Sequence, residues 1–97
     1  MKRRSVIYAP EAADDLDWIY GTIAAAASPV VAEGYDLRIR TFCESLEYGA
    51  ERGSLRTDIR PGLRVIGFER RVAVAFLVEP DRVVILRILY GGADLGL

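Results

Sequence analysis

The sequence has no histidine, one cysteine (Cys43) and one lysine (Lys2) among its 97 residues. Without histidine, catalytic triads and acid–base catalysis by imidazole are excluded. A single cysteine cannot form an internal disulfide, and it leaves too few nitrogen and sulfur ligands for zinc. We therefore predict no bound metal, no cofactor and no disulfide framework of the kind that holds small secreted proteins together.

Long uncharged stretches are also missing. The longest covers residues 18–32, is interrupted by Gly21 and Pro29, and is too short to cross a bilayer. The basic start at residues 1–4 is followed by an apolar run that Pro10 ends too early for a secretion signal. These features predict a cytoplasmic protein with no membrane contact.

The overall composition is that of a folded chain. Hydrophobic residues make up 52% and the net charge is −1, which argues against disorder, and the length suits a single domain over residues 1–97. The charge is uneven, because residues 1–51 carry five basic and nine acidic side chains while residues 52–97 carry eight arginines and five acids. Guanidinium groups pair with carboxylates and phosphates, so the C-terminal half suits an anionic partner.

Apolar spacing predicts one strand followed by two helices. Residues 5–9 form a short apolar run, and Pro10 opens a helix that fades by residue 27. Ser28 and Pro29 are a typical helix start, and the second helix continues for about 18 residues to a stop at 48–50. The buried stripes comprise Ala12, Leu16, Ile19, Tyr20 and Ile23, then Val31, Tyr35, Ile39, Phe42, Cys43 and Leu46.

Three further strands are predicted at residues 63–68, 72–78 and 82–89, joined by hairpin-length connections. The order strand-helix-helix-strand-strand-strand (β-α-α-β-β-β) predicts an α+β fold, in which a helical hairpin covers one face of an antiparallel sheet. Residues 51–60 are expected to form a loop. The uncovered face is expected to be cationic and to receive a partner, although an open antiparallel face is often simply solvated.

Arg87 interrupts the last apolar strand. Strict alternation places Arg87 on the same face as Val83 and Ile85. A charge in such a strand either serves a function or is buried against a carboxylate, and we favour a function for Arg87, with burial against an acid as the alternative.

Three stretches of this sequence resemble ParE-type toxins of the RelE/ParE superfamily, from bacterial type II toxin–antitoxin modules. They are residues 8–19 (YAPEAADDLDWI), residues 51–54 with 58–64 (ERGS, DIRPGLR), and residues 84–94 (VILRILYGGAD). Their order and distances match the family over nearly the whole chain. The resemblance implies the same β-α-α-β-β-β fold.

The resemblance also implies a growth-inhibiting toxin that a cognate, ParD-like antitoxin holds inactive in a hetero-oligomer. Operator DNA would be bound only through the antitoxin. The ParE branch of the superfamily is associated with poisoning DNA gyrase, and the RelE branch with cutting mRNA in the ribosomal A site.

These two mechanisms make different demands on the residues. An RNase site would use Arg64 and Arg87 to hold the scissile phosphate, with Tyr90 beside them, but it also needs a base that this sequence does not offer. We therefore predict no catalytic residues and a toxin that poisons gyrase by binding. An mRNA endonuclease is the alternative, as is a non-toxic module that only binds a partner.

The residues predicted to contact an antitoxin or a target are the cations of the C-terminal half and the tyrosine beyond the last strand. Arg60 and Arg64 could instead pair with Asp58 or with acids of the helices. The predicted contact residues are Arg56, Arg60, Arg64, Arg71, Arg87 and Tyr90.

Overall fold

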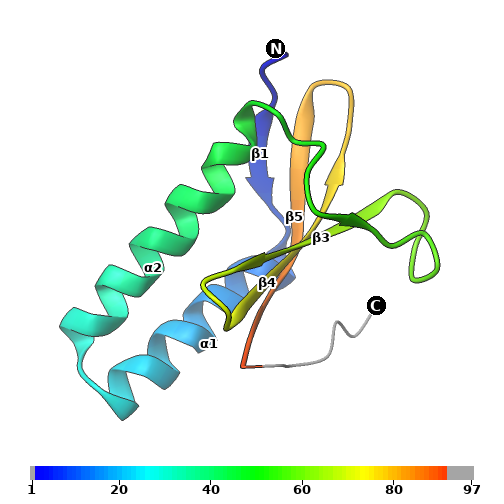
Figure 1. Cartoon of the computed structure of the whole chain (residues 1–97). Coiled ribbons are helices and arrows are strands. Elements are labelled where there is room, and N and C mark those ends of the chain that lie inside the picture. The colour runs from blue at the N-terminus through cyan, green and yellow to red at the C-terminus, as the bar shows by residue number, and fades with distance from the viewer. Residues whose placement is uncertain (1, 92–97) are drawn as a thin grey trace.

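The computed structural model describes residues 2–91, and residues 1 and 92–97 lie outside the description. Two helices and a short 3₁₀ turn separate the first strand from the other four (Figure 1). The elements are β1 (Ser5–Tyr8), α1 (Pro10–Ala26), α2 (Pro29–Glu44), η1 (Ser45–Glu47), β2 (Ser54–Leu55), β3 (Leu63–Phe68), β4 (Val72–Val78) and β5 (Arg82–Tyr90).

Both predicted helix starts are confirmed. Pro10 and Pro29 occupy the first helical turns, where no intrahelical N–H bond is lost. The Ser28 hydroxyl accepts a hydrogen bond from the backbone N–H of Val31 at 3.2 Å, which caps α2. Since only Ala27 and Ser28 separate the helices, they form the antiparallel hairpin seen in Figure 1.

The α+β class is confirmed, but the sheet is mixed rather than wholly antiparallel. Its strand order is β1-β5-β4-β3-β2, and β1 runs parallel to β5 while the other neighbours are antiparallel. The parallel pair arises because α2 carries the chain back past β1 to its start, where the N–H of Arg4 donates to the carbonyl of Glu47 at 2.8 Å. The predicted loop at 51–60 also contains a fifth strand, β2.

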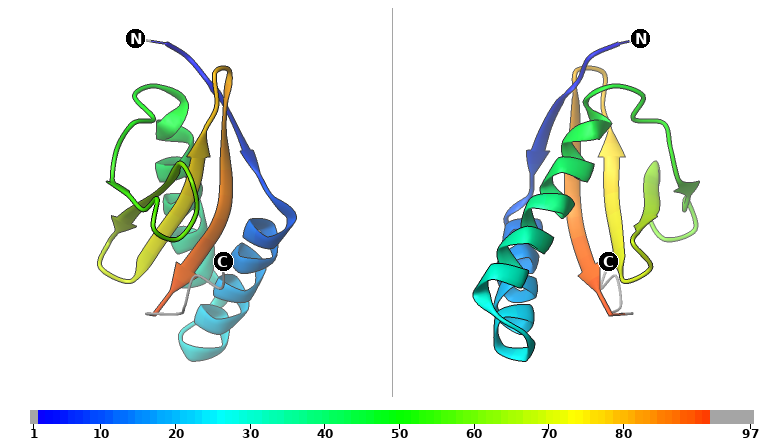
Figure 2. Two further views of the ribbon diagram at one scale, coloured as in Figure 1. Left: turned by 90° about the vertical axis from the view of Figure 1, so that its right-hand side faces the viewer. Right: turned by 60° about the vertical axis from the view of Figure 1, so that its left-hand side comes forward.

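The core lies between the helical hairpin and one face of the sheet. Both helices lie on that side of the sheet (Figure 2). The fully buried core residues include Leu16, Ile39, Phe76 and Ile85. Most of the predicted helical stripes are confirmed, but Val31 is 50% exposed, because the neighbouring Ala32 takes the buried position.

A one-residue bulge in β5 changes which side chains share a face. Ala75 of β4 pairs with Arg87, whereas the next residue, Phe76, pairs with Ile85, so Leu86 is the extra residue. The bulge moves Arg87 off the face of Ile85, where strict alternation placed it. Arg87 instead shares the face of Ala75, away from the core.

Candidate functional site

Arg87 forms the least exposed ion pair among the described residues. Its Nε and Nη2 donate to the two carboxylate oxygens of Asp15, in α1, at 2.7 and 2.9 Å. The side chains of Arg87 and Asp15 are 25% and 16% exposed. A bidentate pair of this geometry fixes both groups, and the neighbouring carboxylate raises the pKa of Arg87 further above its ordinary value.

The same carboxylate also satisfies the backbone of β5. The N–H of Ile88 donates to Asp15 Oδ2 at 2.9 Å. Beyond Ile85 the four-residue β1 no longer pairs with β5, so this edge of β5 would otherwise expose an unpaired donor. The geometry thus favours the interpretation of Arg87 as a charge buried against an acid. Asp15 links α1 to β5 through hydrogen bonds to both Arg87 and Ile88.

Arg64 lies in a different environment. It pairs with Phe76 in the sheet register, and Phe76 pairs with Ile85, so Arg64 belongs to the helix-facing side of the sheet. Its guanidinium makes no ion pair and no side-chain hydrogen bond with any residue between 2 and 91. The side chain is nevertheless only partly exposed.

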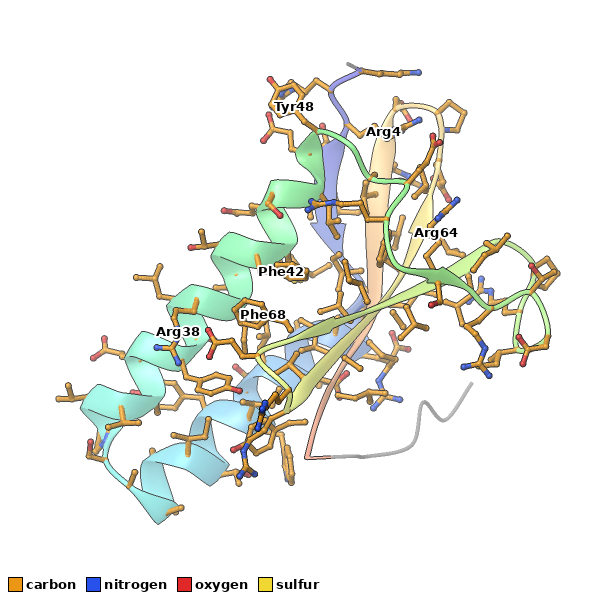
Figure 3. The ribbon with its side chains drawn as sticks, in the orientation of Figure 1. Arg4, Arg38, Phe42, Tyr48, Arg64 and Phe68 are labelled. Carbon is orange, nitrogen blue, oxygen red and sulfur yellow. The ribbon has the colours of Figure 1, made fainter. Side chains whose placement is uncertain are left out.

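Arg64 borders a hollow of about 410 Å³, here called the cationic hollow, at the end of the sheet that α2 leaves uncovered. Arg4 reaches into it from the segment before β1 and donates from Nε to the carbonyl oxygen of Glu79 at 2.8 Å. Figure 3 shows Arg4 and Arg64 at the same end of the molecule. The lining residues are Arg4, Glu51, Leu55, Gly62, Arg64, Val78, Glu79 and Pro80.

A second hollow, here called the aromatic groove, lies between α2 and the end of β3. Phe42 stacks on Phe68 with ring centroids 4.8 Å apart and planes at 25°. Arg38 closes its rim by pairing with Glu69, with Nε and Oε2 2.9 Å apart, and Leu37 beside it is 65% exposed. The groove is mostly apolar. In Figure 3 its residues Arg38, Phe42 and Phe68 lie apart from Arg4 and Arg64 of the cationic hollow.

The other predicted contact residues are dispersed. Tyr90 packs edge-on against Tyr35 of α2, with ring centroids 5.9 Å apart, so it belongs to the helix-facing side. Arg71 lies in the turn between β3 and β4 and accepts at its carbonyl oxygen from the N–H of Gly91. Arg56 forms a bidentate pair with Asp58, which lowers the pKa of that carboxyl.

Arg56 and Arg60 belong to the connection between β2 and β3. Figures 1 and 2 show this connection projecting on the side of the sheet away from α2. The expectation that Arg60 or Arg64 pairs with Asp58 is not met, since Arg56 occupies that carboxylate.

The residues proposed for an RNase site are not brought together. Arg64 and Arg87 lie on opposite faces of the sheet by register, and Arg87 is engaged by Asp15. Tyr90 shares the face of Arg64, but it lies two strands away, and its β4 partner Val72 is four residues from Phe76, which corresponds to roughly 13 Å along the strand. No single phosphate can contact all three.

The far face of the sheet is apolar rather than cationic, which corrects the expectation for the open side. Two of its strand residues are arginines, Arg82 and Arg87, each paired with a carboxylate, and the others are mostly small or aliphatic side chains. By register these are Leu63, Val65, Ala73, Ala75, Leu77, Val84 and Leu89. Among the described residues, Arg64 is the strand arginine without an ion pair, and it lies on the helix-facing side of the sheet.

No sequence pattern indicated that Arg4 and Phe42 border hollows. Arg4 is one of several basic residues at the start of the chain, and its contact with Glu79 spans 75 positions. Phe42 fitted the buried stripe of α2, but it is only half buried, because the sheet ends beside it at Phe68. Trp18 of α1 is 60% exposed.

The lone cysteine is a packing residue. Burial raises the pKa of the Cys43 thiol to about 12, so it carries almost no thiolate at neutral pH. Between residues 2 and 91, no three His, Cys, Asp or Glu side chains gather closely enough to hold a metal ion. No helix in the described part of the chain has the length and hydropathy needed to cross a membrane.

Comparisons with known proteins identify relatives of this fold. The family model described as the ParE toxin of the type II toxin-antitoxin system, parDE, matches residues 6–95. No curated protein matches the sequence. Among solved structures, a chain from the chromosomal ParDE TA system of P. aeruginosa is 29% identical in sequence. It aligns with a TM-score of 0.79 over 91% of this chain and 96% of that chain.

Proposed function

Because the chain belongs to the ParE toxin family of type II toxin-antitoxin systems, we propose that it inhibits growth by binding DNA gyrase and that a cognate antitoxin neutralises it. In this proposal the protein is a poison that acts by contact and catalyses no reaction. The observation that carries the choice is the separation of Arg64, Arg87 and Tyr90, which leaves no shared site for a scissile phosphate.

Charge and shape support a binding role. The C-terminal half carries eight arginines, and such a surface attracts acidic protein or the phosphates of DNA held by gyrase. Arg60 adds an exposed cation on the connection between β2 and β3, where it has no ion pair with any described residue. We propose that this connection approaches the target, while the cationic hollow and the aromatic groove receive the antitoxin.

The target is tested with purified components. Gyrase, supercoiled plasmid, ATP and the full chain are incubated, and cleaved DNA is released with detergent and protease. We expect linear plasmid to accumulate with increasing protein. Arg60→Glu should reduce this accumulation at least tenfold, whereas Arg70→Glu, a matched charge reversal in the turn between β3 and β4, should change it less than twofold. Intact plasmid at every concentration would overturn the assignment to gyrase.

The neutralisation and the alternative mechanism are tested in cells. Induction of this gene alone is expected to stop growth with signs of DNA damage, and co-expression of the adjoining gene should restore growth. The ends of cellular mRNA are mapped in the same cultures. Cuts phased with codons in the ribosomal A site, without DNA damage, would instead assign the protein to the nuclease class.

A further inference from the structure

Arg64 makes no ion pair with any described side chain, although Glu51 and Glu79 border the same hollow. It projects from a strand in the sheet and is only partly exposed. A partly desolvated charge without a partner costs free energy that a ligand carrying the opposite charge can recover. The neighbouring cation Arg4 is already anchored, through the carbonyl of Glu79 at 2.8 Å and through Glu51 at 3.6 Å.

We propose that the cationic hollow binds a peptide segment that presents a glutamate or aspartate carboxylate to Arg64 and lays a flanking apolar side chain on Leu55 and Val78. A guanidinium can hold such a carboxylate through two parallel hydrogen bonds. The proposal rests on the proposed function only in taking the antitoxin as the natural source of this segment.

The lining of the hollow selects a peptide over a nucleic acid. Half of the residues that border it are apolar or glycine, and Leu55 is 56% exposed, which suits a partner with aliphatic side chains. Glu51 and Glu79 also face the hollow. One carboxylate directed at Arg64 can avoid these two acids, whereas a chain of phosphates would run past them and be repelled.

The anchoring of Arg4 prepares the hollow for this ligand. The Arg4 side chain is 15% exposed and its Nε is committed to a backbone carbonyl, so its position does not depend on the ligand. Arg4 then forms an ordered wall of the hollow, with its charge offset by Glu51, and Arg64 supplies the donors that no described carboxylate engages. A site with one cation already ordered loses less conformational entropy when it binds. The structure thus assigns the main recognition role to Arg64 and a supporting role to Arg4.

The test uses the full chain and a phage-displayed library of random 12-residue peptides. We expect the enriched peptides to contain an acid next to an apolar residue, and synthetic copies should bind measurably. Arg64→Ala should weaken them at least tenfold, and Arg64→Gln, which keeps the size without the charge, should do the same. Arg70→Ala, a matched arginine outside the hollow, should change binding less than twofold. Equal unfolding midpoints in urea show that the variants are folded.

Three results would overturn the proposal: no enrichment of peptides, enriched peptides without acids, or binding that Arg64→Ala leaves intact. A 20-nucleotide single-stranded DNA and inorganic phosphate serve as competing probes. Tighter binding of the DNA, lost in Arg64→Ala, would assign the hollow to nucleic acid instead. The outcome is independent of the gyrase assay, so the peptide site can stand if gyrase is not the target, and it can fail while gyrase is poisoned.

Discussion

Arg64 and Arg87 both interrupt apolar strands of one sheet, yet their surroundings differ. Arg87 donates from Nε and Nη2 to the two carboxylate oxygens of Asp15, and the same carboxylate accepts from the N–H of Ile88 at the edge of β5. Arg64 lies on the opposite face, beside a hollow, with no carboxylate bound to it among residues 2–91. One arginine belongs to the folded scaffold, and the other is available to a ligand.

The difference shows that the role of a charged residue in a strand depends on which carboxylate the fold brings near. Asp15 lies 72 positions from Arg87, and only the packing of α1 against β5 joins them. Arg64 is nearer in sequence to Asp58, but Arg56 has taken that acid. Sequence proximity of opposite charges therefore did not predict either arrangement.

Removing Arg87 should have the largest effect on stability. Arg87→Ala leaves Asp15 partly buried without its partner, so we expect the free energy of unfolding to fall by about 2 kcal/mol. For a domain of this size that corresponds to a loss of roughly 10 °C in Tm. Urea unfolding followed by circular dichroism measures the change. An unchanged midpoint together with lost toxicity would return Arg87 to a functional role.

Asp15→Asn should cost less, about 1 kcal/mol. Its side-chain oxygen can still accept the N–H of Ile88, while the ionic contact with Arg87 is lost. A double-mutant cycle with Arg87→Ala isolates the coupling, because removal of Arg87 should make the second change smaller. Fully additive losses would mean that the two side chains do not stabilise the fold through each other.

Alkaline pH should affect titratable groups of the core, but not the charges of Arg64 and Arg87. Both guanidinium groups stay charged there, whereas burial raises the pKa of Cys43 from an ordinary value of 9 to about 12 and raises that of Tyr8 as well. The folded state therefore keeps protons that the unfolded state releases, so stability is constant below pH 9 and falls above it. We expect a loss of about 1 kcal/mol by pH 10. Cys43→Ala should flatten this slope, and a stability loss already at pH 8 would contradict the assignment.

Arg64→Ala is expected to give the smallest change, below about 0.5 kcal/mol, since no ionic contact among the described residues is removed. The same unfolding experiment as for Arg87 provides the measurement. A loss as large as that of Arg87→Ala would erase the contrast between the two arginines and would assign Arg64 to the scaffold.

The fold was predictable because its signals are local. Proline at two helix starts, the Ser28 cap and the apolar stripes are read within a few residues, and the structure confirms them. The parallel pairing of β1 with β5 was missed because it depends on where α2 ends in space. The two-residue β2 was missed because it is too short to show alternation.

The surroundings of the site were predictable only in part. One bulge explains why Arg87 lies on the face opposite to the one that alternation predicted. Alternation in β5 breaks at Leu86, and nothing in the apolar sequence around it marks the extra residue. The bulge reverses the face on which Arg87 lies and thereby separates it from Arg64. Arg64 was among the predicted contact residues and stays a prediction, whereas Arg4 and the hollow that they share depend on contacts across most of the chain.

The position of β5 between β1 and β4 also has a consequence during synthesis. The ribosome makes β5 after every other described strand, yet β1 and β4 join only through it. While translation continues, the nascent chain therefore has a helical hairpin and an incomplete sheet, with its first strand unpaired. The described sheet can be completed only after β5 has been made and has left the exit tunnel, so its surface forms later than the helical hairpin.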